Sequence, residues 1–446
     1  MTKNTEIWQF YHIYPLGFCN APKYNDLMLK PTFRLDLVRK WVSHLKSIGI
    51  NALYFGPIFE STHHGYDIID YYDIDRRLGT LESVKTLFEF LHESGFKIII
   101  DGIFNHTGRD FWAFKDIQKN GQNSRYKEWY SNLNFTYKNS YNDDFSYDSW
   151  NGCDDLVKLN LYNEEVRNHL FGAVKMWIEY LKIDGIRLDS CDSLDLTFIK
   201  ELCRFSRKLD PNIWLMGEII HGDYRKWVND EMLDSVTNYV CYKGLWSSLN
   251  DSNFFEIAYT LNQQYGANGM YSNLLLYNFV DNHDVNRAAS ILNNSFHLYP
   301  LYIMLYTIPG IPSIYYGSEW GWSGKKIHSD DYPLRPFIEI EQVENLAPHL
   351  DLKKVIIKLS KIRAQLKEIR LGSYFAIHTA FKQFIYCRKL GNDEIIIAIN
   401  SDNREVEVEL KKPINGYDIL NDEDVKKNSD RSLKIYPNWG RIIKKV

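Results

Sequence analysis

The sequence predicts an α/β fold: a closed (β/α)8 TIM barrel, a small domain inserted after the third strand, and a C-terminal antiparallel β-sandwich. Apolar runs alternate with amphipathic stretches, which is typical of βα units around a parallel sheet. Three of those runs end in a carboxylate, at Asp189, Glu218 and Asp284. Loops beyond the carboxyl ends of barrel strands carry the active site, so the three acids are expected to converge at one mouth.

Eight strands are predicted in chain order, each from a short apolar or β-branched run. They are residues 9–14, 52–57, 97–104, 183–189, 213–218, 235–239, 274–280 and 311–316. Stretches between them have apolar positions at helical spacing, such as residues 35–48, 81–94 and 164–181. Eight alternations are what a closed barrel of this type requires.

Two regions interrupt the alternation. Residues 107–159 are rich in Asn, Asp, Ser and aromatic side chains, and a loop of that length is usually functional or a small subdomain. We expect it to flank the barrel mouth. After about residue 370 the pattern changes to short alternating β runs, as at 384–388, 394–400 and 406–410. The predicted domains are therefore a barrel of residues 1–106 and 160–370, an insertion at 107–159, and a β-sandwich at 371–446.

The composition of the chain limits the classes of molecule that the protein is expected to bind. The chain has 446 residues and 45% hydrophobic content, enough for a large core in two or three domains. With a formal charge of -4, the chain has no excess of basic residues that would attract nucleic acid or an anionic membrane surface. Aromatic residues make up 15% of the chain, which suits a neutral ligand with flat apolar faces and many hydroxyls, such as a sugar.

Targeting and cysteine patterns indicate a cytoplasmic protein. The N-terminus has no apolar stretch of signal-peptide length, and no run reaches the ~20 apolar residues needed to span a bilayer. The six cysteines are scattered without CxxC spacing, so neither a zinc site nor a disulfide framework is indicated.

The carboxylates have the features of a catalytic pair. Arg187 and Asp189 are two apart on one strand and share a face, so the guanidinium is expected to keep Asp189 ionised as a nucleophile. Glu218 follows an apolar run beside Trp214, where desolvation would raise its pKa toward general-acid use. On adjacent strands such groups would be about 5 Å apart, as in retaining glycoside hydrolysis. The alternative for each acid is a helix cap or a buried ion pair, and three acids at matching positions favour catalysis.

Four motifs in order give a specific resemblance. Residues 101–106, 185–189, 217–219 and 282–284 resemble the four signatures of the α-amylase superfamily, glycoside hydrolase family 13. Residues 56–59, 65–67 and 310–317 also match, so the likeness covers essentially the whole chain. It implies that Asp189 is the nucleophile, Glu218 the acid/base and Asp284 the transition-state stabiliser.

The resemblance also implies a set of substrate-binding residues. His106, Arg187 and His283 would hold the sugar at the cleavage point, and Tyr66 would stack on it. Asp331 and Arg335 match the residues that grip hydroxyls one subsite beyond. Simpler roles compete: core histidines, core packing for Tyr66 and a surface pair on a loop for Asp331 and Arg335. We expect Asp101 to pair with Arg187 as structural support.

Further matches narrow the subgroup. Residues 156–160 and 217–221, the latter ending in His221, resemble motifs of the neopullulanase and cyclomaltodextrinase group. That group carries an extra N-terminal domain, whereas this chain starts at the first barrel strand, so the oligomeric state stays open. Asp192 and Ser193 replace the Lys-His pair that typical α-amylases carry after the nucleophile, which argues against an endo-acting starch amylase.

No cofactor is expected. Lys158 stands where typical α-amylases have an aspartate ligand for calcium, and an ammonium can replace a cation's charge but cannot ligate it. Calcium elsewhere in the chain stays open.

The sequence therefore predicts a retaining hydrolase that cleaves α-1,4 bonds of maltooligosaccharides or cyclodextrins through a covalent intermediate. A transglycosylase or an α-1,6-acting glucosidase of the same family is the first alternative, because a sugar hydroxyl can resolve that intermediate as water does. A catalytically inactive barrel that serves as a binding subunit is the second. The presence of all three carboxylates argues against it.

Overall fold

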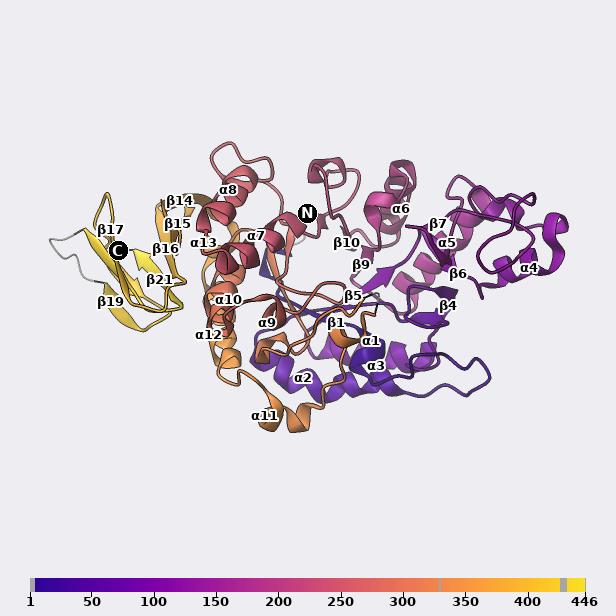
Figure 1. Ribbon diagram of the computed structural model, residues 1–446, viewed down its shortest axis with the longest axis horizontal. Helices are drawn as coiled ribbons and strands as arrows, with labels where there is room; N and C mark the ends of the chain where they lie inside the picture. The colour runs from indigo at the N-terminus through magenta and orange to yellow at the C-terminus, as the bar shows by residue number, and fades with distance from the viewer. Residues whose placement is uncertain (1–4, 329, 426–430, 446) are drawn as a thin grey trace.

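A computed structural model describes residues 5–328, 330–425 and 431–445 (Figure 1). Its largest sheet has eight parallel strands in the order β11-β10-β9-β5-β2-β1-β13-β12. A parallel bridge between Thr237 and Tyr277 joins the first and last strands and closes the barrel. The predicted closed barrel is thus confirmed. Its strands are β1 (Phe10–Ile13), β2 (Ala52–Phe55), β5 (Lys97–Gly102), β9 (Gly185–Leu188), β10 (Trp214–Gly217), β11 (Ser235–Val236), β12 (Tyr277–Asn278) and β13 (Ile311–Tyr315).

Side chains along each strand alternate between the barrel interior and the surrounding helices. Phe10 and Ala52 join an inner cluster with Trp214, whereas their neighbours Tyr11 and Leu53 join the larger core outside. Both faces of the strands are therefore buried, which explains why they are near-continuous apolar runs in the sequence.

The helices surround the barrel, and three of the longer ones begin at polar caps. Thr80 and Ser83 form a capping box, and the side chains of Asn163 and Asp195 accept hydrogen bonds from the first turns of their helices. The α-helices of the barrel region are α1 (Pro15–Phe18), α2 (Val38–Ser47), α3 (Leu81–Glu93), α5 (Glu164–Glu179), α6 (Leu196–Leu209), α7 (Tyr239–Asn250), α8 (Phe254–Tyr265), α9 (Ala288–Ile291), α10 (Leu298–Thr307), α11 (Val343–Leu346), α12 (Leu352–Gln365) and α13 (Lys367–Leu371).

A β-hairpin that the sequence analysis did not predict follows β2. It consists of β3 (Phe59–Ser61) and β4 (Ile68–Ile74), and the connection between them carries Tyr66. Gly65 has φ 88°, and a Cβ there would lie 2.5 Å from the Pro57 ring, so only glycine fits this turn. The hairpin places Tyr66 among the residues at the barrel mouth.

The insertion forms a small sheet and a helix beside the barrel. Its strands are β6 (His106–Gly108), β7 (Ser149–Trp150) and β8 (Cys153–Lys158), in the order β6-β8-β7, and its helix is α4 (Trp112–Asn120). In Figure 1 this region lies at the opposite end of the molecule from the C-terminal sheets.

The C-terminal region is an antiparallel β-sandwich, as predicted. Six strands pair in the order β14-β15-β16-β21-β18-β19, and β17 pairs with β20. Alternate residues of β15 face opposite ways: Phe384 and Tyr386 pack against the barrel core, and Ile385 packs between the two sheets. The strands are β14 (Ser373–Thr379), β15 (Gln383–Leu390), β16 (Asp393–Asn400), β17 (Val406–Glu409), β18 (Gly416–Asp418), β19 (Glu423–Val425), β20 (Ser432–Ile435) and β21 (Trp439–Lys445).

Two further observations concern the described residues. All six cysteines lie in the described residues, and Cys153 alone among them is exposed. None of the helices in residues 5–328, 330–425 and 431–445 combines the length and the apolar composition that crossing a membrane requires. The expected domain boundaries stay predictions.

Candidate active site

The inward positions of three adjacent strands change from apolar to charged toward their carboxyl ends. Asp101 on β5 lies in register with Arg187 on β9, and Arg187 lies in register with Met216 on β10. Because side chains alternate along a strand, every second residue faces the interior. The inward series are Ile99 and Asp101 on β5, Gly185 and Arg187 on β9 followed by Asp189, and Trp214 and Met216 on β10 followed by Glu218. Charged groups therefore gather at one end of the barrel.

Arg187 is the centre of this cluster, and its side chain is almost entirely buried. Nη1 donates to Asp101 Oδ1 and to Asp189 Oδ1, each at 2.7 Å, and Nη2 lies 2.8 Å from Glu218 Oε1. The expected pairing of Asp101 with Arg187 is confirmed. The contact with Glu218 was not predicted, and it means that one guanidinium bridges both carboxylates of the proposed catalytic pair.

The electrostatics of Asp189 differ from the sequence-based expectation. Burial raises the pKa of Asp189 well above its usual range; Arg187 opposes this, while Glu218 and two other nearby carboxylates add to it. The sequence predicts that Arg187 keeps Asp189 ionised, whereas the pKa of Asp189 shifts upward, because desolvation of the buried carboxylate outweighs the one guanidinium that it shares. Asp189 and Glu218 contact the same guanidinium, so one cation faces two carboxylates.

Asp284 lies in a different electrostatic environment. Its Oδ2 is 3.0 Å from His283 Nε2 and its Oδ1 is 3.1 Å from Arg335 Nη2. Burial acts to raise the pKa of Asp284, but His283 and Arg335 outweigh it and hold the pKa well below the usual range. Its side chain is 36% exposed, against 9% for Asp189 and 10% for Glu218. Asp284 is therefore an ionised carboxylate at the open side of the cluster.

The other predicted aromatic and histidine residues are close by. The Tyr66 hydroxyl donates to Asp101 Oδ2 at 3.0 Å and contacts His283 Nε2, and the two rings stack with centroids 5.4 Å apart. His106 begins β6 and is buried, which lowers its pKa to about 3. Its Nε2 has no hydrogen-bond partner among the described residues. His106 is thus neutral near pH 7, with one ring nitrogen unpaired among the described residues.

Arg335 contacts several members of the site, and the alternative of a surface pair is wrong. It is 7% exposed, its Nε donates to the His283 carbonyl oxygen at 3.0 Å, and its Nη2 lies 3.3 Å from Asp331 Oδ2. Asp331 and Arg335 therefore join the cluster through Asp284. His221, in contrast, is exposed and lies outside this hydrogen-bonded cluster of described residues.

Two residues that were not predicted from the sequence also contact Glu218. The Tyr239 hydroxyl, at the start of α7, donates to Glu218 Oε1 at 3.2 Å, and the Ser190 backbone N–H donates to Oε2 at 3.1 Å. Ser190 has φ 44°, a left-handed conformation that is rare for a residue other than glycine. Tyr239 is the last residue of a predicted strand, and Ser190 follows the proposed nucleophile. Their positions at strand ends are the sequence signal that could have identified them as site residues.

Lys158 stands at the usual calcium position of the resembled family, and the expectation that calcium is absent there stays a prediction. Lys158 lies on β8 opposite His106, and its backbone N–H donates to Asp148 within the insertion. The carbonyl oxygen of Asn105 accepts the Leu159 N–H, and its amide nitrogen lies 3.3 Å from His106 Nδ1. Among the described residues no three His, Cys, Asp or Glu side chains are grouped to hold a metal ion.

Comparisons with known proteins agree with this geometry. The family model described as alpha amylase, catalytic domain, matches residues 13–333. The chain belongs to the alpha-amylase family. The enzyme is 30% identical over 97% of its length to the cyclomaltodextrinase of Thermoanaerobacter pseudethanolicus, of which the alignment covers 77%. It is equally similar, at 30% over 97% of its length, to neopullulanase 2 of Thermoactinomyces vulgaris, again with 77% of that protein covered.

A solved structure shows the same fold over the full length of the enzyme. The ligand-free cyclic alpha-maltosyl-(1→6)-maltose hydrolase of Arthrobacter globiformis matches with a TM-score of 0.83 at 23% identity, and the match covers 99% of both chains. The enzyme is thus a glycoside hydrolase similar to cyclomaltodextrinases and neopullulanases.

Proposed function

We propose that the enzyme hydrolyses α-1,4-linked maltooligosaccharides or cyclodextrins with retention, through a covalent glycosyl-enzyme intermediate. This proposal rests on Arg187, which contacts both Asp189 and Glu218. The two carboxylates directly follow the adjacent strands β9 and β10. Carboxyl groups held by one guanidinium suit the separation of about 5 Å at which one acts as nucleophile and the other as acid, with no water between them.

In the proposed reaction one of the two carboxyl groups starts with a proton and the other starts ionised. With that proton on Glu218, the Asp189 carboxylate attacks the anomeric carbon as Glu218 protonates the departing glycosidic oxygen. The glycosidic bond breaks and an ester to Asp189 forms. Glu218, now ionised, removes a proton from water, which attacks the same carbon and releases Asp189. The Ser190 N–H and the Tyr239 hydroxyl hold Glu218 in place for both steps.

The remaining residues have roles in binding the sugar. Asp284, kept ionised by His283 and Arg335, would stabilise positive charge that develops on the ring in the transition state. The resemblance places His106 at the cleavage point, where its buried Nε2 has no hydrogen-bond partner among the described residues. Tyr66 presents a ring beside His283 for stacking on the apolar face of glucose.

Short or cyclic glucans fit the site better than a polymer does. The Trp150 ring on β7 lies 6.1 Å from the His106 ring, which brings the insertion to the side of the barrel mouth. An insertion at that position restricts a long chain while offering aromatic surface to a short one. Small substrates are therefore expected to be preferred.

The test is to incubate the enzyme with maltotriose, β-cyclodextrin, pullulan, isomaltose and soluble starch and to resolve the products. We expect kcat/KM for maltotriose or β-cyclodextrin to exceed that for starch per cleavable bond, with α-configured products. Cleavage of isomaltose in place of maltotriose would instead assign α-1,6 specificity, and longer products at high substrate would assign transfer. Faster cleavage of starch with rapid loss of viscosity would reject the proposed substrate class.

A further inference from the structure

The loop between α1 and the short helical turn Arg34–Leu37 exposes a large aromatic side chain near the site. Tyr24 is 72% exposed, and its ring centroid lies 4.8 Å from the His63 ring at an interplanar angle of 79°. A tyrosine ring that is this exposed buries little apolar surface, so core packing does not explain it. Its neighbours are polar, with Lys23 beside it in the chain and His63 against its ring.

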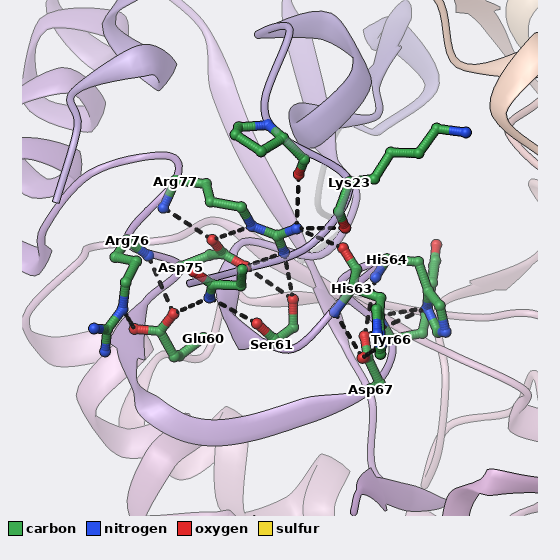
Figure 2. A network of polar contacts seen from close by, with 12 residues as sticks. Lys23, Glu60, Ser61, His63, His64, Tyr66, Asp67, Asp75, Arg76 and Arg77 are labelled. Atoms are coloured by element: carbon green, nitrogen blue, oxygen red, sulfur yellow. Dashed lines mark hydrogen bonds and ion pairs between the residues drawn. The ribbon is translucent and has the colours of Figure 1, made fainter. Parts of the chain in front are cut away.

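The backbone that carries Tyr24 is held in a fixed position. Figure 2 shows Arg77 at the centre of a polar network, where its Nη1 donates to the carbonyl oxygens of Pro22, Lys23 and His63 at 3.0, 3.0 and 2.7 Å. The same guanidinium forms a buried ion pair with Asp75 at 2.6 Å. The segments on both sides of the Tyr24–His63 contact are therefore fastened to one buried cation.

Asn25 fixes the loop from the other side of Tyr24. Its backbone N–H donates to the Thr62 carbonyl oxygen at 2.9 Å, and its side-chain amide donates to the Ser61 carbonyl oxygen at 2.7 Å. Tyr24 is thus an exposed ring on a backbone that is ordered before any ligand arrives. Such preorganisation lowers the entropy that binding would otherwise lose.

Contacts lead from Tyr24 to the catalytic cluster along the hairpin connection. His63 and His64 both bind Asp67, and the His64 carbonyl oxygen accepts a hydrogen bond from the Tyr14 hydroxyl at 2.6 Å. The Tyr14 ring lies 5.8 Å from the ring of His283, the neighbour of Asp284.

A second path reaches the cluster through the preceding residue. Lys23 Nζ lies 3.7 Å from the centre of the Tyr332 ring. Tyr332 follows Asp331, which contacts Arg335, and Arg335 contacts Asp284. The first path ends at His283 and the second at Asp284, the more exposed carboxylate of the cluster, so both connect Tyr24 to the side of the site that holds the Asp331–Arg335 pair.

We propose that Tyr24 is the stacking platform of an outer sugar subsite, with Lys23 and His63 beside it as donors to hydroxyl groups. This inference rests on the proposed glucanase function. An α-glucan has alternating apolar ring faces and hydroxyl edges, which match an exposed aromatic ring with polar neighbours. The subsite binds a glucose unit further from the cleaved bond than the unit at Asp331 and Arg335. It therefore increases the reactivity of longer oligosaccharides relative to shorter ones.

The test is the chain-length dependence of kcat/KM across maltotriose to maltoheptaose in three variants. Tyr24→Ala removes the ring, Tyr24→Phe keeps it, and Phe33→Ala removes an exposed ring from the far end of the same loop. We expect the ratio of kcat/KM for maltoheptaose to that for maltotriose to fall about fivefold in Tyr24→Ala. Tyr24→Phe and Phe33→Ala should keep the wild-type ratio. An unchanged ratio in Tyr24→Ala, or an equal fall in Phe33→Ala, would overturn the inference.

A binding measurement separates failure of the subsite from failure of the proposed function. Calorimetric titration of the Asp189→Asn protein with maltoheptaose needs no turnover, and adding Tyr24→Ala should weaken binding about fivefold. If wild type cleaves no α-1,4 glucan but this loss of binding is seen, the subsite stands and the proposed function fails. If wild type cleaves the series and the binding is unaffected, the subsite alone fails. Absence of both cleavage and binding rejects both.

Discussion

Glu218 Oε1 lies 2.8 Å from Nη2 of Arg187, whose other terminal nitrogen contacts Asp189. The two carboxylates therefore share one buried cation. The raised pKa of Asp189 follows from burial and from the excess of carboxylates over cations around it. This environment of Asp189 gives the first two predictions.

Replacing Asp189 by Asn is expected to abolish turnover of maltotriose and β-cyclodextrin while leaving the fold intact. The amide is nearly isosteric with the carboxylate but cannot form the glycosyl ester. The loss in kcat should be about a thousandfold or more, with an unchanged circular dichroism spectrum. Activity within about tenfold of wild type, a barrier change of ~1.4 kcal/mol, would remove Asp189 from the nucleophile role.

The same variant is expected to be more stable than wild type near neutral pH. In the folded protein the pKa of Asp189 is raised above its unfolded value of about 3.9. Between the unfolded and the folded pKa, the folded wild type binds more protons than the unfolded chain, so its free energy of unfolding falls as pH rises. Asn removes that loss, so the free energy of unfolding of the variant should exceed that of wild type by an amount that grows with pH and reaches about 0.5–2 kcal/mol. Calorimetric Tm values of both proteins at about pH 4.5 and about pH 7.5 test this. A stability difference that shrinks with rising pH would show that the sign is wrong.

Arg335→Lys is expected to lower kcat/KM for maltotriose about 10- to 100-fold. A lysine is a point charge, and it cannot reproduce the contacts of the guanidinium with Asp284, Asp331 and the His283 carbonyl oxygen together. The exposed Arg225, which pairs with Asp223, offers a matched control in Arg225→Lys. Steady-state kinetics of both variants with maltotriose test this expected fall in kcat/KM. Equal, near-wild-type values would mean that Arg335 has no part in positioning Asp284.

Arg77→Met is expected to destabilise the fold by about 3–5 kcal/mol, because it leaves the Asp75 carboxylate buried without its cation. Arg225→Met is the matched control, since Arg225 pairs with Asp223 at the same spacing but both side chains are about half exposed. Urea unfolding should show a large drop in midpoint for Arg77→Met and almost none for Arg225→Met. Similar midpoints for the two variants would contradict the assignment of Arg77 as the anchor of the Tyr24 loop.

Chelation is expected to leave both activity and Tm nearly unchanged. Lys158 stands on β8 opposite His106, where an ammonium group cannot ligate calcium. A bound metal stabilises only the folded state, so its removal would lower Tm measurably. The measurement compares activity and Tm before and after dialysis against EDTA, with magnesium as the control addition. A fall that calcium reverses and magnesium does not would show that the enzyme holds a calcium ion.

The sequence alone determined the elements whose signal is local. Strands that are buried on both faces must be apolar throughout, so all eight barrel strands could be predicted, although the structure shortens β11 and β12 to two residues each. The period of two along a strand also placed Arg187 and Asp189 on one face. The β3–β4 hairpin and the α7–α8 pair were not predicted, because both depend on packing against the barrel.

Tertiary structure decided everything that depends on burial and on distance through space. It brought Arg187 to Glu218, placed Tyr239 and Ser190 on that carboxylate, buried Arg335 and left His221 exposed. It also reversed the expected pKa of Asp189. A pKa depends on desolvation and on every charge within a few ångströms, and these come from segments far apart in the chain. Residue order can therefore indicate which carboxylates meet, whereas only the packed structure determines the direction in which burial and neighbouring charges shift the pKa of a carboxyl group such as Asp189.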